Sequence, residues 1–320
     1  MITKTEQEII SNWQDITSNP IASICCITSN PIASICCITY NHEKYIAQAL
    51  DSILTQEGKY SYEILIGEDC STDKTRELLM NYQEKFPHII KLMLHDDNIG
   101  MMKNFIGTLQ SCSGKYIAIL EGDDYWTDSY KLQKQIHFLE NNPEYIITYT
   151  SSLSFIKKNQ VLGKSGGTEV DLSAEDLLKA PPLNTLTTCF RNIITSFPPE
   201  IYASKLGDLF IWSLLGEHGK GKFLDDIEPS MYRIHEDGVF SEKSKKQKYE
   251  MALITDVALF TYYNRIHKNM LADFFKYRII DYWMTSESLT KLLLYILSLK
   301  YTKMKNKLRK KLTKLFFWTK

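Results

Sequence analysis

The sequence predicts an α/β fold in three layers, with helices on both faces of a mostly parallel central sheet. Two observations lead to this prediction. From residue 33 onward, short apolar runs rich in β-branched residues alternate with segments of helical periodicity. The chain has 320 residues, of which 44% are hydrophobic and 24% are charged. It therefore has enough apolar residues for a large core, and it belongs neither to the disordered nor to the small disulfide-stapled proteins.

Five strands are expected, and each is an apolar run bounded by polar or turn-forming residues. They are Ala33–Thr39, Tyr62–Gly67, Ile89–Leu94, Lys115–Leu120 and Tyr145–Thr150. The helices expected between them are Glu43–Gln56, Asp73–Phe86, Met101–Ser111 and Lys131–Asn141. Beyond residue 150 the periodicity weakens, and the elements expected there are a hairpin or loop at 159–167, a helix at Asp208–Glu217 and helices from Ser244 onward.

This pattern divides the chain into an N-terminal extension (1–32), an α/β domain (33–240) and a helical, basic C-terminal region (241–320). The extension contains most of a tandem duplication, because SNPIASICCIT occurs at Ser18–Thr28 and again, unchanged, at Ser29–Thr39. Only the second copy runs on into Tyr40-Asn41-His42. We therefore place the first strand in the second copy and interpret the first copy as a spare segment.

The net charge of zero hides an asymmetry along the chain. The 38 basic and 38 acidic residues cancel, so no overall field favours nucleic acid as a partner. After Glu287, however, the chain has no acidic residue and ten basic ones, which leaves 38 acidic and 28 basic groups, a net charge of −10, in the first 287 residues. An acidic body therefore carries a basic C-terminal tail.

The tail has the pattern of a basic amphipathic helix. At about 100° per residue, an apolar face lies opposite a face of lysines, the two sets being Tyr301, Met304, Leu308, Leu312 and Leu315 against Lys303, Lys307, Lys310 and Lys314. Such a helix suits an anionic membrane surface, which predicts a cytoplasmic protein bound peripherally at the inner face of the cell membrane. A helix packed on the body and a disordered tail are the alternatives.

The cysteines agree with a cytoplasmic location. There are seven, an odd number without a Cys-x-x-Cys pair, which indicates buried, reduced thiols and not a disulfide or zinc framework. The first residues include acidic groups and lack the apolar core of a signal peptide. The apolar run Leu292–Leu299 near the tail is too short to span a bilayer.

Polar residues follow three of the predicted strands, as Tyr40-Asn41-His42, Glu68-Asp69-Cys70 and Glu121-Gly122-Asp123-Asp124. In a parallel sheet these ends lie at one edge, where α/β folds bind ligands. Clustered carboxylates repel one another unless a cation compensates them, and Mg²⁺ and Mn²⁺ prefer such oxygen ligands. No Gly-x-x-x-x-Gly-Lys motif is present and no Gly-x-Gly-x-x-Gly follows the first strand, which excludes a P-loop or dinucleotide fold.

Three segments in this order, ASICCITYNHEKYIAQALDSILTQ, YEILIGEDCSTDKT and GKYIAILEGDDYWTD, resemble the family 2 glycosyltransferases. The resemblance covers roughly residues 33–240 and includes Gly207-Asp208-Leu209 and YRIHEDG at 232–238. It implies the GT-A fold and transfer of a sugar from a nucleotide sugar, mostly with inversion. Bacterial members of the family commonly build surface polysaccharides and lipo-oligosaccharides.

The resemblance also implies roles for individual residues. Asp208 matches the catalytic base, while Asp124 and His235 match metal ligands, with Asp124 as the main one and Mn²⁺ or Mg²⁺ as the expected cofactor. The residues expected to bind the nucleotide sugar are Thr39, Tyr40, Asn41, Glu43, Asp69 and Asp123. This chain has Glu68-Asp69-Cys70 and Glu121-Gly122-Asp123-Asp124 where many members have Asp-Asp-Gly and Asp-x-Asp-Asp, which leaves open whether Glu121 touches the metal.

Structural roles compete with these assignments, because aspartates near the start of a helix commonly cap it. Capping is the competing role for Asp69, Asp123, Asp124 and Asp208. His235 is suited equally to a structural role, and Arg233 is an alternative partner for phosphate charge. We expect His42 to be a turn residue and not a ligand, and Cys70 to be a packing residue and not a nucleophile.

The sequence therefore predicts an inverting glycosyltransferase that moves a hexose-type sugar from a nucleoside diphosphate sugar to a hydroxyl of a glycan or lipid-linked acceptor. A nucleotidyltransferase of related fold is disfavoured, because a Gly-rich phosphate loop with Arg or Lys is missing after the first strand. The remaining alternative is an inactive sugar-nucleotide-binding or scaffold protein of the same fold. Entry of the first copy of the duplicated segment into the sheet would replace Tyr40-Asn41-His42 with Ser29-Asn30-Pro31.

Overall fold

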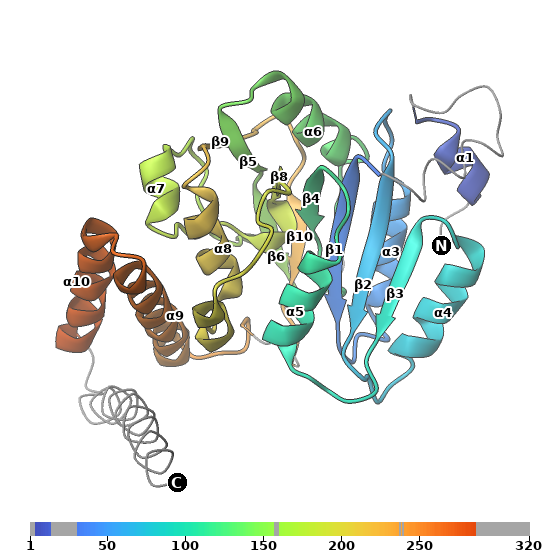
Figure 1. Ribbon diagram of the computed structural model, residues 1–320. Helices are drawn as coiled ribbons and strands as arrows, with labels where there is room; N and C mark the ends of the chain where they lie inside the picture. Colours follow the sequence, from blue (N-terminus) through green and yellow to red (C-terminus); the bar gives the residue numbers. More distant parts are fainter. Residues whose placement is uncertain (1–3, 14–30, 157–159, 237, 239, 286–320) are drawn as a thin grey trace, which may run out of the picture.

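The computed structural model describes residues 4–13, 31–156, 160–236, 238 and 240–285. Its centre is a seven-stranded sheet of order β3-β2-β1-β4-β8-β5-β9 (Figure 1). In chain order its strands are β1 (Ala33–Thr39), β2 (Tyr62–Glu68), β3 (Ile90–Leu94), β4 (Tyr116–Ile119), β5 (Tyr145–Tyr149), β8 (Cys189–Arg191) and β9 (Lys220–Phe223). Only β8 runs antiparallel to its neighbours in this sheet. The predicted mostly parallel α/β fold is confirmed.

Helices cover both faces of this sheet. One core contains side chains of α1 (Glu6–Ile10), α3 (Ile46–Leu54), α4 (Thr75–Lys85) and α6 (Lys131–Asn141), and the other contains side chains of α5 (Met101–Gln110), α7 (Ala174–Leu178) and α8 (Gly207–Leu215). Inner strands contribute to both, since Ile35 and Cys37 of β1 lie in the first core and Cys36 in the second. Strands buried on two faces are apolar throughout, which made them recognisable in the sequence.

The strand order places a switch point between β1 and β4. From β1 the chain moves outward through β2 to β3, and it then returns to add β4 on the other side of β1. At such a reversal the connections leave in opposite directions and open the carboxyl edge of the sheet. The residues that follow β1 and β4 are therefore the first place to look for a ligand site.

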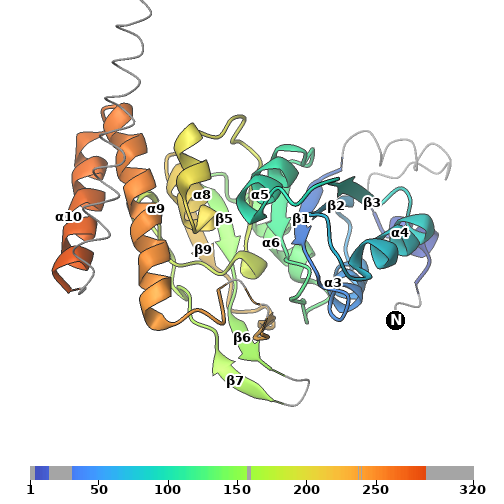
Figure 2. The same cartoon turned by 90° about the horizontal axis from the view of Figure 1, so that it is seen from below.

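A second sheet of three strands lies beside this edge, in the order β10 (Ser230–Arg233), β6 (Ser152–Phe155) and β7 (Val161–Lys164). The β6–β7 hairpin corresponds to the hairpin expected at 159–167, and it projects away from the main sheet (Figure 2). A bridge between Tyr125 and Met231 ties β10 to the turn after β4. The second sheet thereby brings the end of β10 to the switch point.

The C-terminal region begins with two antiparallel helices, α9 (Lys245–Arg265) and α10 (Asn269–Thr285), which pack on α8 and on the 3₁₀ turn Pro199–Ala203 (Figure 1). Arg278 of α10 lies 3.0 Å from the Asp256 carboxylate and also donates to the Lys179 carbonyl. In the described part of the chain, no helix is long and apolar enough to cross a membrane. The amphipathic tail predicted at 301–318 lies outside the described residues.

Residues 4–13 of the N-terminal extension belong to the core. The Trp13 ring packs edge-on against Tyr62, with 5.2 Å between the ring centroids. The Glu6 carboxylate accepts a hydrogen bond from the backbone N–H of His88, just before β3. The sequence did not predict this docking, because a five-residue helix is too short to show helical periodicity.

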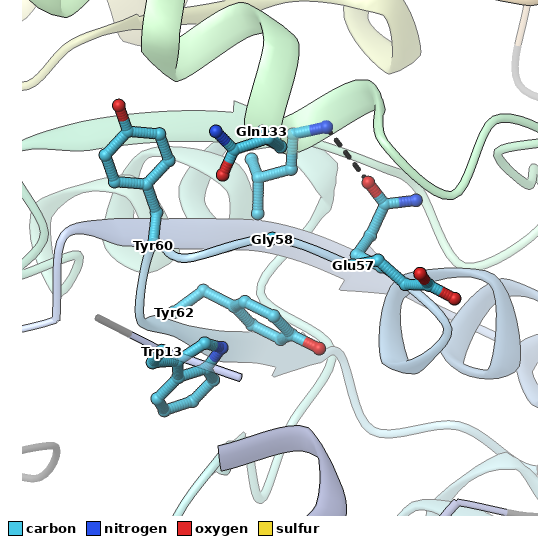
Figure 3. Close-up of a pocket in the computed structure, with 8 residues that line it drawn as sticks. Trp13, Glu57, Gly58, Tyr60, Tyr62 and Gln133 are labelled. Carbon is cyan, nitrogen blue, oxygen red and sulfur yellow. Dashed lines mark hydrogen bonds between the residues drawn. The ribbon is translucent and has the colours of Figure 1, made fainter. Parts of the chain in front are cut away.

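A hollow beside Trp13 lies at the opposite end of the sheet from the switch point (Figure 3). Its walls come from the segment that leads into β2, including Tyr60 and Tyr62, and from Gln133 of α6. These side chains mainly pack the N-terminal segment against the domain. The hollow therefore lies away from the candidate site at the carboxyl edge.

The second copy of the duplicated segment forms β1, as predicted, and the first copy lies outside the described residues. Because the copies are identical, deletion of either one gives the same chain, in which residues 14–17 and 29–32 link Trp13 to the start of β1. These anchors are close together, because Trp13 packs on Tyr62 and Tyr62 is paired with Ala33.

We expect this eleven-residue deletion to change the free energy of unfolding by no more than about 1 kcal/mol, because loop closure entropy varies slowly with loop length. Urea unfolding of the two chains measures the difference. A loss of more than about 3 kcal/mol would instead show that the first copy contributes to the core, since that is the scale of a lost large core side chain.

Candidate active site

The ends of β1, β2 and β4 are joined at the carboxyl edge of the main sheet. The backbone N–H of Asp69 donates to the Thr39 carbonyl over 3.1 Å, and that of Gly122 donates to the Ile38 carbonyl over 3.0 Å. The polar residues that follow these strands therefore lie side by side, as the sequence predicted. The end of β10 completes the site from the second sheet.

The turns after β1 and β2 hold each other in place. The Asn41 side chain accepts a hydrogen bond from the Thr72 N–H over 2.8 Å, and the Glu43 carboxylate accepts one from the Lys74 N–H over 3.1 Å. Asn41 has a φ of 57°, a left-handed conformation that asparagine tolerates. Asn41 and Glu43, both predicted to bind the nucleotide, thus also shape the turn at which it would bind.

Thr39 and Tyr40 present groups that a ligand can use. The Thr39 hydroxyl is buried and has no hydrogen-bond partner among the described residues, and Tyr40 is 42% exposed. Because any nucleobase can stack on an exposed aromatic ring, this pair is suited to the nucleoside contact that the sequence predicted.

Asp69 is buried and holds the segment that leads into α5. Its two carboxylate oxygens accept the backbone N–H groups of Ile99 and Gly100, over 2.7 and 3.0 Å. Asp69 does not cap the helix that begins near Asp73, which was its competing role, because Asp73 itself accepts the Thr75 N–H at the start of α4. Each oxygen of Asp69 keeps a further lone pair, so contact with a base stays a prediction.

His42, Asp123 and His235 form a group of three possible metal ligands, the one such group that the described chain contains, with one ligand atom from each within 4.8 Å of the others. His235 Nε2 lies 3.0 Å from an Asp123 carboxylate oxygen, and His42 Nε2 lies 3.8 Å from the same oxygen. We expected His42 to be a turn residue and not a ligand, and the structure places its Nε2 in this group. In the sequence, only the position of His42 directly after the first strand could have indicated that it joins this group.

Asp124 contacts a different element. It is buried, and one carboxylate oxygen accepts the backbone N–H of Arg233 over 2.7 Å. The structure therefore groups His235 with Asp123, whereas the sequence assigned Asp124 as the main metal ligand and Asp123 to the nucleotide sugar. The physical reason is that consecutive residues in the turn after β4 direct their carboxyl groups to different neighbours.

Three carboxyl groups within four residues shift one another's pKa. Burial raises the pKa of Glu121 to about 7, and the charge of Asp123 adds to the shift. Burial, with the charges of Asp123 and Glu121, raises the pKa of Asp124 well above its usual value. Burial also raises the pKa of Asp123, but the hydrogen bond from His235 and the charges of His42 and His235 outweigh it and bring the pKa below its usual value. The negative charge therefore concentrates on Asp123.

Arg233 connects the acidic turn to the second sheet. Its guanidinium carbon lies 4.6 Å from the ring centre of Tyr45 and 4.5 Å from that of Phe155. Its Nε donates to the Asp123 carbonyl over 2.7 Å, in addition to the backbone bond described above. Tyr45 also packs against the His235 ring, with 4.8 Å between centroids. Arg233 thus fixes the turn that carries both aspartates, a role that no local sequence pattern indicates.

Asp208 lies in the first turn of α8, one residue after Gly207 and two after the N-cap position, Leu206. It is therefore not the cap, which was its competing role. Burial raises its pKa to about 6, although hydrogen bonds from backbone N–H groups oppose the shift. Its charge also adds to the raised pKa of Glu121, so it faces the acidic cluster. A carboxyl group with such a pKa is suited to accept a proton near neutral pH.

Comparison with known sequences matches the profile described as Glycosyl transferase family 2 to residues 34–195 of this chain. A relative from Escherichia coli, named UDP-Glc:alpha-D-GlcNAc-diphosphoundecaprenol beta-1,3-glucosyltransferase WfgD, is 26% identical over 221 residues, which are 68% of this chain and 83% of WfgD. Mycobacterial relatives reach 40% identity over 110 residues, but the chain covers only 32% of their length.

Two solved structures share the fold. S. aureus TarS in complex with UDP-GlcNAc superposes with a TM-score of 0.57 at 18% identity, covering 82% of this chain and 75% of that chain. The mannosyltransferase PcManGT from Pyrobaculum calidifontis, in complex with GDP-Man and Mn²⁺, superposes with a TM-score of 0.52 at 13% identity, covering 92% of this chain and 85% of that chain. At these identities the likeness establishes the fold.

Replacement of Arg233 by lysine is expected to lower the free energy of unfolding by about 2–4 kcal/mol. Lysine keeps the charge but loses the planar group between two rings and the Nε hydrogen bond. Urea unfolding measures the loss.

Arg265→Lys is the matched control, because Arg265 forms an exposed ion pair with Glu200 that contributes about 1 kcal/mol or less. Equal stability of the two lysine variants would contradict the positioning role of Arg233.

Proposed function

Because this chain belongs to glycosyl transferase family 2, we propose that it transfers a hexose-type sugar from a nucleoside diphosphate sugar, with inversion, to a hydroxyl of a glycan or lipid-linked acceptor. One observation carries this proposal. The edge of the main sheet at the switch point between β1 and β4 carries both three possible metal ligands and Asp208, a carboxyl group whose pKa is raised. Synthesis of a surface polysaccharide or lipo-oligosaccharide is the proposed setting, since the name of WfgD gives a sugar carried on diphosphoundecaprenol as its acceptor.

The donor nucleotide is proposed to lie over the turn after β1. Its base would stack on Tyr40, accept or donate a hydrogen bond at the Thr39 hydroxyl, and reach Asp69. A UDP-sugar is the first donor to test, because the name of WfgD gives UDP-Glc and the TarS complex contains UDP-GlcNAc.

Asp208 is proposed as the general base. Its carboxylate takes the proton from the acceptor hydroxyl while that oxygen forms the new bond to C1 of the donor sugar. The bond between C1 and the diphosphate oxygen breaks at the same time, and the nucleoside diphosphate leaves with the electron pair, so the configuration at C1 inverts. With a pKa of about 6, Asp208 is mostly ionised at neutral pH and still basic enough to accept the proton.

The residues present fit a divalent metal ion. Ligand atoms from the turns after β1 and β4 and from the end of β10 converge within 4.8 Å, and the negative charge of the turn concentrates on Asp123. We therefore propose Asp123 and His235 as metal ligands, with His42 as the third, and assign Asp124 to the turn that Arg233 fixes. When bound, the metal would neutralise charge on the donor diphosphate. Two imidazoles favour Mn²⁺ over Mg²⁺, which prefers oxygen ligands only.

Isothermal titration with Mn²⁺ tests this ligand set. We expect Asp123→Asn to weaken Mn²⁺ binding by at least about tenfold, since even the residues behind a metal ligand contribute that much. Asp124→Asn is the matched control, because the amide oxygen can still accept the Arg233 N–H, and we expect a change of less than about threefold. Comparable losses in both variants, or a loss in Asp124→Asn alone, would contradict the assignment.

Release of nucleoside diphosphate from a panel of UDP-, GDP- and dTDP-sugars tests the proposed activity, with Mn²⁺ or with EDTA. We expect release from a UDP-sugar in the presence of Mn²⁺ and none with EDTA. Asp208→Asn should lower the turnover by about 10²–10⁴, the usual contribution of a general base, while the affinity for the nucleotide is kept. Absence of both release and metal-dependent nucleotide binding would favour the inactive, sugar-nucleotide-binding alternative.

A further inference from the structure

The first turn of α9 and the residues before it present an exposed surface of lysines and aromatic rings. Phe240 and Tyr249 are 39% and 49% exposed. Glu242 is the one acidic residue between them. Among the described residues none of the lysines forms an ion pair with a carboxylate. We call this surface the α9 patch, and it consists of Phe240, Lys243, Lys245, Lys246, Lys248 and Tyr249.

The lysines and rings of the patch contact one another, and Tyr249 also contacts α10. Lys248 Nζ lies 4.8 Å from the ring centre of Phe240, and Lys245 Nζ lies 5.8 Å from that of Tyr249. Tyr249 packs against Tyr282 of α10, with 6.0 Å between centroids. The exposed aromatic rings therefore lie next to lysine side chains.

The first turn of α9 lies at the same end of the molecule as the carboxyl ends of the inner strands (Figure 1). His235 of the site lies nine residues before Ser244, the N-cap of α9, and the backbone N–H of Gly238 donates to the His235 carbonyl in a tight turn between them. In Figure 1 the carboxyl ends of β1, β2 and β3 and the first turn of α9 all lie at the lower side of the molecule.

The sequence beyond α10 is strongly basic. Because α10 runs antiparallel to α9, it ends where α9 begins, as the contact of Tyr282 with Tyr249 shows. The 35 residues that follow α10, 286–320, contain ten lysines and arginines and one acidic residue, Glu287. The most basic part of the sequence therefore begins directly after the end of α10.

We propose that the α9 patch binds the surface of an anionic lipid bilayer and turns the candidate active site toward it. Lysines that carry no partner carboxylate attract anionic headgroups, and aromatic side chains among them enter the headgroup region. A second copy of this chain is a poor occupant, because a two-fold contact would bring the lysines of both copies together. This proposal does not rest on the chemistry at Asp208.

Co-sedimentation of the full chain with vesicles tests the proposal. We expect binding to vesicles with about 30% phosphatidylglycerol in phosphatidylcholine, and at least about tenfold weaker binding to pure phosphatidylcholine. Raising the salt to about 0.5 M should weaken binding to the anionic vesicles, because screening shortens the reach of the charges.

Charge reversal at two patch residues, Lys245→Glu with Lys246→Glu, should weaken binding to the anionic vesicles by about tenfold or more. The matched control reverses two exposed lysines elsewhere, Lys85→Glu with Lys220→Glu, and should stay within about twofold of the original protein. Phe240→Ser keeps every charge of the patch and should weaken binding severalfold. All variants change exposed side chains, and thermal unfolding verifies that they fold.

Three outcomes would overturn the proposal. The first is that the original chain fails to bind anionic vesicles. The second is that the patch and control variants lose binding equally, which would show that binding to the vesicles depends on the overall charge of the protein and not on the patch. The third is that the patch variant changes only self-association, measured by light scattering, which would make the surface a contact between copies. Nucleotide-sugar turnover without vesicles should not change in the patch variant, so failure here is distinguishable from failure of the proposed activity.

Discussion

Three of four consecutive residues, Glu121, Asp123 and Asp124, carry carboxyl groups at the edge of the sheet between β1 and β4, and the rest of the site is arranged around them. Burial and the charges of neighbouring carboxylates raise the pKa values of Glu121 and Asp124, whereas the neighbouring histidines lower the pKa of Asp123. The fold supplies compensation from two sides, with His42 after β1 and Arg233 and His235 at the end of β10. Asp123, the carboxyl group whose pKa is lowered, therefore lies beside two imidazoles, and these three residues are the metal ligands proposed above.

The second sheet is what makes this compensation possible. Its register pairs Arg233 with Phe155, and the guanidinium lies close to the rings of both Phe155 and Tyr45. Because side chains alternate along a strand, a slip of one residue between β10 and β6 would turn Arg233 to the opposite face and bring Ile234 in its place. The bridge from Met231 to Tyr125 opposes such a slip. The short strands outside the main sheet therefore determine the electrostatics inside it.

The sequence predicted the parts of the fold that local patterns determine. The inner strands are continuous apolar runs because both of their faces are buried, and polar residues directly after them mark the edge. Local patterns could not predict the group of possible metal ligands. Asp123 and Asp124 are adjacent in the chain, and only their contacts with His42 and Arg233 distinguish them. Three-residue β8 and the docked helix α1 were missed for the same reason, since tertiary pairing and not local periodicity defines them.

Asp208 shows how function and stability oppose each other at one residue. The amino end of α8 favours an ionised carboxylate, yet burial dominates and raises the pKa from 3.8 to about 6. The folded state therefore binds this proton more tightly than the unfolded chain does. Ionisation of Asp208 therefore lowers the free energy of unfolding. The loss is complete above about pH 6, and it disappears as the pH falls below the pKa of Asp208 in the unfolded chain. At neutral pH a base must be ionised, so the state required for proton transfer is the one that the fold disfavours. The raised pKa of Asp208 and its charge interaction with Glu121 agree with the general-base role proposed for it.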